Sequence, residues 1–200
     1  VYGDTTLGRL HLPNKELIDL QDYRTRYAQY RLDPDFQQAH RMQAFITIWD
    51  DHEISNNAYQ SGAQNHQPEE GDYEVRKSAA KQAYYEWLPV RENEARHLYR
   101  SFAYGNLVDL IMLDERLAGR YPQVDSVTQE GFNSPERSML GKEQLAWFKD
   151  QLQNSQAQWK VIGNQVVFSN LDITAVGWKG LVNKDAWDGY PAEQQDIIQT

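Results

Sequence analysis

The chain has 200 residues, enough for one domain with a hydrophobic core, and hydrophobic residues make up 40% of it. Its formal net charge of −9 argues against a nucleic-acid backbone as the main partner, because phosphate binding needs a basic surface. The absence of cysteine excludes disulfides, thiolate metal ligands and cysteine nucleophiles within this stretch, and no apolar run approaches the roughly 20 residues that span a bilayer.

The first part of the chain predicts two helices, a strand and a long loop. Leucine and tyrosine residues recur at helical spacing over residues 17–30, and Asp33-Pro34 ends that pattern. A second short helix is expected over 34–42. Residues 44–49 are entirely apolar and partly β-branched, which predicts a short buried strand. The polar, turn-rich residues 55–72 are typical of a long loop, and long loops in compact domains are often functional.

The remaining elements follow from apolar spacing and from Gly and Pro positions. The segment "YEVRKSAAKQAYYEWLP" predicts a helix closed by Pro89. Two strands are expected on either side of Tyr104-Gly105-Asn106, and a long loop over 117–138. The segment "GKEQLAWFKDQLQNS" predicts an amphipathic helix, "WKVIGNQVVFS" predicts a strand or a strand broken at Gly163, and a last helix is expected to begin at Pro191.

Each of the three predicted strands with an apolar core runs into polar residues at its carboxyl end. Trp49 is followed by Asp50, Leu113 by Asp114, and Ile162 by Asn164. In α/β sheets, functional sites collect at the carboxyl ends of strands. We therefore expect these three polar clusters to converge on one edge of a sheet.

The sequence "FITIWDDHEISNN" (residues 45–57) places two aspartates, a histidine and a glutamate in a row. It differs from the zinc-protease pattern His-Glu-x-x-His, because Asn56 replaces the second histidine and the segment follows a predicted strand. The chain contains neither a Gly-x-Ser-x-Gly element nor a phosphate-binding Gly-x-x-x-x-Gly-Lys loop. Carboxylates for a glycosidase are present, but nothing in their spacing favours that chemistry.

Two interpretations of this acidic motif remain open on chemical grounds. A hard cation such as Ca²⁺, Mg²⁺, Mn²⁺ or Fe³⁺ would relieve the repulsion between Asp50 and Asp51, and His52 would then face a metal-bound phosphate. Alternatively, Asp50 caps the following segment, Glu53 is solvated and His52 bonds a backbone carbonyl. Arg116 has the same two possibilities, because it either clamps a phosphate or forms a strand-end ion pair with Asp114.

The order of several segments resembles one known family. "DYRTRYAQYRLDPDFQQAH", "IWDDHEISNN", "AYYEWLPVR", "LYRSFAYGNLVDLIMLDER", "MLGKEQLAWFKDQL", "WKVIGNQVVFS" and "DAWDGYPAE" resemble segments of the alkaline phosphatase D (PhoD-like) family of metallophosphatases, in the order of that family. The resemblance covers nearly the whole chain. It implies that residues 1–200 form a single domain, the central part of a PhoD-like catalytic domain.

The resemblance also implies a fold and an activity. The fold is α/β, part of a four-layer α/β/β/α metallophosphatase sandwich that is incomplete at both ends. The activity is metal-dependent hydrolysis of phosphate mono- and diesters, with an iron and calcium centre (manganese or zinc as alternatives). Phosphate-ester small molecules or phospholipid-type substrates and a secreted or periplasmic location belong to the same expectation. The alternative from a different class is a non-catalytic metal- or glycan-binding module.

The resemblance implies roles only for residues at positions that match the motifs of the family. Asp51 matches a metal-ligand asparagine, His52 the histidine that contacts the phosphoryl group, and Glu53 the acidic residue that orients this histidine. Asn164 stands where the broader superfamily has a histidine ligand, and Asp50 completes the predicted metal set. The family's Gly-Asp-x-x-Tyr and Gly-Asp-x-His ligand elements are absent from these 200 residues. We therefore expect this stretch alone, which resembles an internal fragment, to be inactive.

Overall fold

The computed structural model describes residues 10–91, 97–170 and 183–200. The chain divides into two compact units, Val1–His97 and Leu98–Thr200, called here the N-terminal unit and the C-terminal unit. Each unit is described by itself. The assignment of residues 1–200 to a single catalytic domain stays a prediction.

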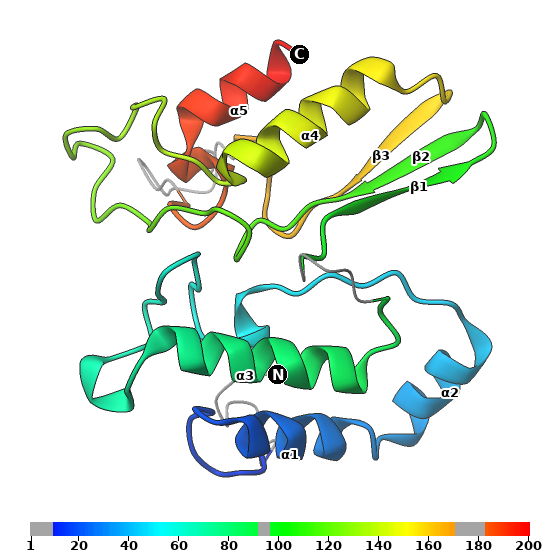
Figure 1. The fold of residues 1–200 in the computed structure, drawn as a ribbon, viewed down its shortest axis with the longest axis vertical. Helices are drawn as coiled ribbons and strands as arrows, with labels where there is room; N and C mark the ends of the chain where they lie inside the picture. The colour runs from blue at the N-terminus through cyan, green and yellow to red at the C-terminus, as the bar shows by residue number, and fades with distance from the viewer. Residues whose placement is uncertain (1–9, 92–96, 171–182) are drawn as a thin grey trace, which may run out of the picture. The chain divides into compact units, whose positions relative to one another are not determined.

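Three α-helices build the N-terminal unit: α1 (Leu20–Tyr30), α2 (Pro34–Met42) and α3 (Tyr73–Trp87). An aspartate caps each of them, because its side chain accepts a backbone N–H of the first turn; these are Asp19, Asp33 and Asp72. Helices α1 and α3 lie side by side (Figure 1), and their facing side chains form the core of the unit, with Tyr23, Tyr27, Ala80, Ala83 and Tyr84 all buried.

The predicted strand over residues 44–49 is wrong. The segment forms neither a helix nor a strand, and no other part of the described chain pairs with it. An apolar sequence favours a strand only when a neighbouring strand supplies the ladder hydrogen bonds. Burial is also less than predicted, since Phe45 is 42% exposed and only Trp49 is fully buried, against the rings of Tyr84 and Tyr85.

Two short 3₁₀ helices lie in the loops of the N-terminal unit that the structure describes. The first, η2 (Asp51–Glu53), carries the acidic motif, and the second is η3 (Pro68–Glu70). The loop between them includes an isolated β-bridge between Tyr59 and Gly62. The long polar loop predicted over 55–72 is therefore confirmed, with short local structure inside it.

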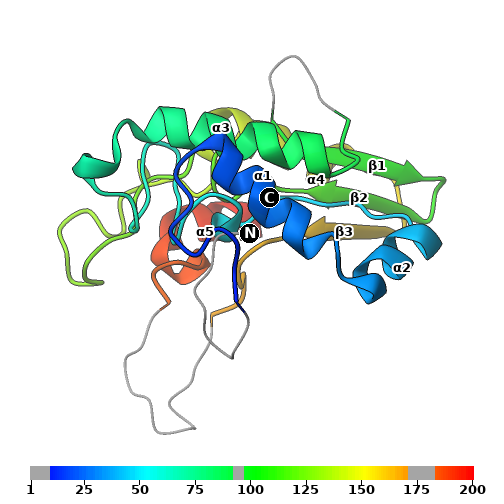
Figure 2. The ribbon, with the colours of Figure 1, turned by 90° about the horizontal axis from the view of Figure 1, so that it is seen from below.

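The C-terminal unit contains a three-stranded sheet in the order β1-β2-β3 (Figure 2). Strands β1 (Arg100–Tyr104) and β2 (Val108–Met112) form an antiparallel hairpin, and β3 (Trp159–Gly163) pairs with β2 in parallel. The predicted turn residue Gly105 has a φ of 60°, a left-handed conformation that glycine adopts without strain. The predicted break at Gly163 is confirmed, because the β3 ladder ends there.

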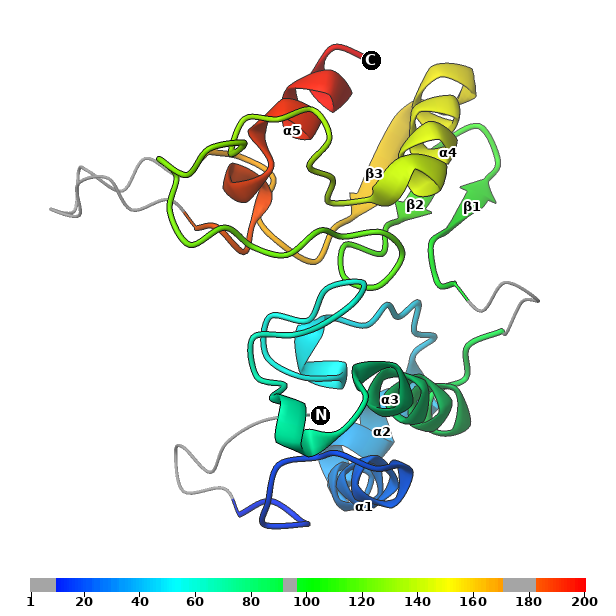
Figure 3. The ribbon, with the colours of Figure 1, turned by 60° about the vertical axis from the view of Figure 1, so that its left-hand side comes forward.

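Helix α4 (Gly141–Asn154) lies over one face of this sheet (Figure 3). Its predicted apolar face packs against Ile111 and Ile162, with Leu145, Phe148 and Leu152 in the contact. The 3₁₀ helix η5 (Trp187–Gly189) and helix α5 (Pro191–Ile198) complete the unit and bring Trp187, Tyr190 and Ile197 into the same core. None of the helices in the described part of the chain combines the length and apolar character needed to cross a membrane.

Candidate functional site

The acidic motif forms a tight turn, residues 50–57, called here the motif turn. The carbonyl of Asp51 accepts the N–H groups of Ile54 and Ser55, both at 2.8 Å. Glu53 Oε2 accepts the N–H of Asp50 at 2.7 Å, which closes the turn at its start. The buried hydroxyl of Tyr23 on α1 donates to the Ile54 carbonyl at 2.7 Å, so the helix core fixes the position of the turn.

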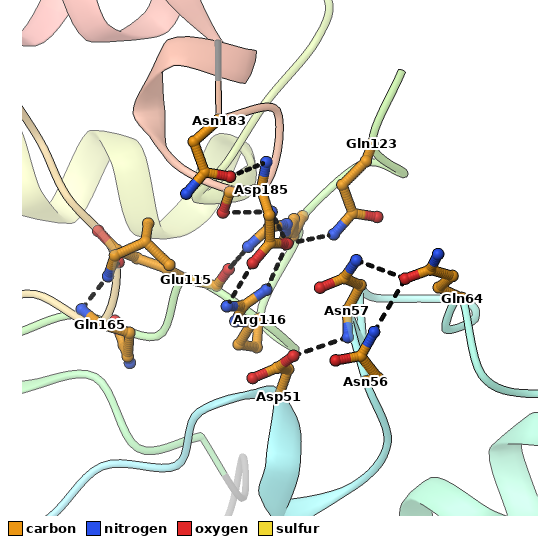
Figure 4. Close-up of polar contacts among 12 residues, drawn as sticks. Asp51, Asn56, Asn57, Gln64, Glu115, Arg116, Gln123, Gln165, Asn183 and Asp185 are labelled. Carbon is orange, nitrogen blue, oxygen red and sulfur yellow. Dashed lines mark hydrogen bonds and ion pairs between the residues drawn. The ribbon is translucent and has the colours of Figure 1, made fainter. Parts of the chain in front are cut away.

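The motif turn holds a buried carboxylate beside an exposed imidazole. Asp51 is only 7% exposed, and its Oδ2 accepts the N–H of Asn57 at 2.7 Å (Figure 4). The His52 side chain is 51% exposed, and its Nε2 lies 3.8 Å from Asp51 Oδ2.

Three amide side chains fix the orientation of His52. Asn56 and Asn57 both donate through Nδ2 to Gln64 Oε1, at 2.9 and 2.6 Å (Figure 4). This leaves Asn56 Oδ1 facing His52 Nε2 at 3.0 Å. Because an amide oxygen only accepts, the His52 Nε2 in this arrangement carries a proton. The two asparagines and Gln64 therefore hold the turn around His52.

The acidic motif does not make a metal site by itself. Among the described residues, no three histidine, aspartate or glutamate side chains come together in a way that would hold a metal ion. Within the motif turn, Glu53 Oε2 is engaged by the Asp50 N–H and Asp51 Oδ2 by the Asn57 N–H. The assignment of Asp50 and Asp51 as metal ligands stays a prediction.

The carboxyl ends of β2 and β3 meet at one edge of the sheet in the C-terminal unit. The Leu113 N–H donates to the Gly163 carbonyl at 3.0 Å, and polar residues come next along the chain, Asp114 after Leu113 and Asn164 after Gly163. Asn164 Oδ1 and Glu115 Oε1 then share the indole N–H of Trp187, at 3.2 and 2.7 Å. Convergence of these two strand ends is confirmed, whereas Asp50 belongs to the other unit.

Asp114 and Arg116 both form polar contacts in the turn after β2. Asp114 Oδ1 accepts the backbone N–H groups of Arg116 and Leu117, at 3.0 and 2.8 Å, and so shapes the turn after β2. The Arg116 guanidinium forms a bidentate ion pair with Asp185, at 2.8 and 2.9 Å (Figure 4). The role of Arg116 as a phosphate clamp stays a prediction, and its buried fork supports the structural alternative.

The Asp185 carboxylate forms ion pairs with two buried arginines. Arg120 also donates to Asp185 Oδ1, at 2.8 Å, and the side chains of Arg116 and Arg120 are 2% and 0% exposed. Burial would raise the pKa of the Asp185 carboxyl, but the hydrogen bond from Arg116 and the charges of both arginines outweigh it and hold this pKa below its ordinary value. The carboxylate is therefore ionised and paired at neutral pH.

Glu115 is fully buried in the same region. Its Oε2 accepts the N–H groups of Gln165 and Val166, both at 2.9 Å, in addition to the Trp187 bond to Oε1. Burial raises the pKa of Glu115 to about 7, although these three donors oppose the shift. Glu115, Arg116, Arg120 and Asp185 are called here the strand-end cluster.

Sequence reasoning missed Arg120 and Asp185 as members of this cluster. Asp185 lies 69 residues after Arg116, and no local pattern connects the two. The only available signal was the segment "DAWDGYPAE", which begins with Asp185 and supplies Trp187 and Tyr190 to the core.

Comparisons with known proteins place this geometry in a family. The family model described as PhoD-like phosphatase matches residues 1–200. Alkaline phosphatase D of Bacillus subtilis (strain 168) is 37% identical over 199 residues, covering 92% of this chain and 32% of that protein. A solved structure titled "Structure of PhoD" matches with a TM-score of 0.80 and 36% identity, covering 94% of this chain and 37% of that chain.

The predicted α/β fold class is confirmed by the mixed helices and sheet and by this structural match. The chain spans about a third of the length of the relatives that it matches. Because the family model covers all of residues 1–200, the chain belongs to the PhoD-like phosphatase family.

Proposed function

We propose that the chain is part of a phosphohydrolase that cleaves phosphate mono- and diesters. The observation that carries this proposal is the match of the PhoD-like phosphatase model across residues 1–200, which includes the motif turn. Within that turn, a buried carboxylate lies beside an exposed, proton-bearing imidazole, as proton transfer to a phosphate ester requires. The name of the Bacillus subtilis relative, alkaline phosphatase D, supports the same reaction class.

His52 is the proposed proton donor. In the hydrolysis, the oxygen of a water molecule bonds to phosphorus and that water releases a proton to the solvent. The bond between phosphorus and the ester oxygen breaks, and the departing oxygen takes a proton. His52 Nε2 would exchange its contact with Asn56 for that oxygen and release the proton to it.

Glu53 is the proposed positioning residue. Its carboxylate fixes the backbone at Asp50, and it therefore sets the geometry of the turn that presents His52. Arg116 remains the proposed phosphate clamp, with its guanidinium positioned by Asp185.

A metal centre belongs to the proposal for the whole protein. Asp51, Asp50 and Asn164 are the proposed ligands, and iron and calcium are the proposed metals, with manganese and zinc as alternatives. Their oxygen donors suit hard cations, and such a centre would polarise the phosphoryl group and activate the attacking water when bound. We also propose that the substrates are small phosphate esters or phospholipid-type esters and that the protein acts in a secreted or periplasmic location.

The test measures p-nitrophenol release from p-nitrophenyl phosphate and bis(p-nitrophenyl) phosphate. It uses the full-length protein that carries this sequence, with Fe³⁺, Ca²⁺ or Mn²⁺ added. His52→Gln is expected to lower kcat by about 10²–10⁴-fold, the usual contribution of a positioned general acid. His40→Gln is the matched control, because His40 contacts the Phe36 carbonyl within α2, and it should leave kcat unchanged.

Two results would count against the proposal. If no added metal gives turnover, the proposed activity is wrong. If the His52→Gln variant keeps the parental kcat, the proposed role of His52 as proton donor is wrong. Metal-dependent turnover by residues 1–200 alone, lost in Asp51→Ala, would instead overturn the expectation that this stretch needs further ligand segments.

A further inference from the structure

A pocket of about 220 Å³ lies within the N-terminal unit, between α1, α2 and the end of α3. Three aromatic rings, a leucine, an arginine and a glutamate line it: Tyr27, Tyr30, Phe36, Leu88, Arg31 and Glu53. Its rim reaches the surface of the described structure, since Tyr30 and Phe36 are 40% and 38% exposed. A cavity of about 150 Å³ with apolar walls is known to hold a benzene ring, so this pocket has room for a ring with a short polar substituent.

Tyr27 lines this pocket and carries a hydroxyl without a hydrogen-bond partner. Tyr27 is 6% exposed, and its hydroxyl has no hydrogen-bond partner. A buried hydroxyl without a partner costs about 1–3 kcal/mol, and native structures rarely leave one. Burial raises the pKa of Tyr27, so the hydroxyl keeps its proton and remains available as a donor.

Arg31 supplies a positive charge to the same pocket. Its guanidinium lies 4.9 Å from the centre of the Phe36 ring and donates one bond to the Trp87 carbonyl at 2.8 Å. Within residues 10–91, 97–170 and 183–200, no carboxylate forms an ion pair with Arg31 (the salt bridges of this part of the chain involve other cations). A guanidinium with free donors beside an unpartnered hydroxyl suits an anionic oxygen group.

We propose that this pocket binds a small aromatic monocarboxylate. The ring of the ligand would lie among Tyr27, Tyr30 and Phe36, and its carboxylate would accept the Tyr27 hydroxyl and pair with Arg31. The Glu53 carboxylate in the wall repels a dianion about twice as strongly as a monoanion, which favours a carboxylate over a phosphate. The site is therefore separate in chemistry from the proposed phosphate-ester chemistry of His52.

The test titrates the full-length protein with 4-hydroxyphenylacetate and with the neutral 4-hydroxyphenylacetamide, by calorimetry and by NMR chemical-shift mapping. Saturable binding of the acid is expected, with shifts centred on the pocket lining. The amide should bind about tenfold more weakly, since it loses the charge-assisted bond to Arg31. Binding is the readout rather than turnover, so the result is independent of the proposed phosphohydrolase activity.

Tyr27→Phe is the deciding variant, because it keeps the ring and removes only the hydroxyl. It should bind the acid about tenfold more weakly while unfolding no more easily than the parent, since the lost hydroxyl has no partner. Tyr104→Phe on β1, where the tyrosine is 53% exposed, is the matched control and should bind like the parent. Phe36→Ala, at the rim, tests the ring contact in a second way and should also weaken binding.

The proposal is overturned by any of three results. These are no saturable binding of the acid, shifts confined to residues outside the pocket, or parental affinity in both Tyr27→Phe and Phe36→Ala.

Discussion

The motif turn and the strand-end cluster are built in opposite ways. The contacts of the motif turn are local: Asp51 bonds to a residue six positions on, His52 to one four positions on, and Glu53 to one three positions back. In the strand-end cluster, Arg116 and Asp185 are 69 residues apart, and Glu115 and Trp187 are 72 residues apart. A short sequence motif can therefore indicate a site with local contacts, such as the motif turn. It cannot indicate a site such as the strand-end cluster, whose residues are far apart in the sequence.

The two regions also differ in where they keep their charges. His52 is half exposed, so its imidazole faces solvent. The arginines of the strand-end cluster are buried and paired with Asp185, and Arg120 also donates to two backbone carbonyls. Exposed charge suits chemistry, whereas buried and paired charge fixes structure, so substitutions in the strand-end cluster should act mainly on stability.

Asp185→Ala should have the largest effect on stability. It leaves the Arg116 and Arg120 guanidinium groups buried without their shared carboxylate, which costs about 3–5 kcal/mol. Asp196→Ala is the matched control, because it breaks an exposed ion pair with Lys149 and should cost at most about 1 kcal/mol. Urea unfolding followed by tryptophan fluorescence measures both. Equal urea unfolding midpoints for the two variants would show that the ion pairs of the strand-end cluster do not stabilise the fold.

Glu115 should give the next largest effect, as a dependence of stability on pH. Its pKa is about 7 in the folded chain and about 4.5 when unfolded, so the folded state holds the proton more tightly. The resulting stabilisation is complete below about pH 4.5 and is lost as the pH rises through 7, by about 3 kcal/mol for a shift of this size. The free energy of unfolding, measured by urea titration between pH 5 and 8, should therefore fall with pH.

Glu115→Gln removes the titrating group and should flatten that fall, whatever its effect on stability at a single pH. Glu193, whose pKa burial also raises, contributes in the same direction and remains in the variant, so a smaller slope should persist. An unchanged slope in Glu115→Gln would mean that its three N–H donors keep the carboxylate ionised in the folded chain.

The sequence predicted most elements of the fold because their signals are local. Asp33-Pro34 separated α1 from α2, and Gly105 marked the turn of the β1-β2 hairpin. The strand predicted over residues 44–49 was wrong because a strand needs a neighbouring strand to pair with, and the apolar pattern does not specify one. The same limit applied to the site: the ends of β2 and β3 were expected to meet and do, whereas Asp185 could be placed only once η5 had packed into the core.

The smallest effect is expected at an exposed ion pair of the N-terminal unit. Arg24 holds Glu86 through two bonds of 2.6 and 2.5 Å, and these bonds lower the pKa of Glu86 to about 2. Both side chains are about a third exposed, so water and salt screen the attraction. Glu86→Gln should therefore shift the urea midpoint far less than Asp185→Ala, and about 1 M salt should abolish the shift. A loss as large as that of Asp185→Ala would show that pairing geometry, and not burial, decides which charges in this chain are structural.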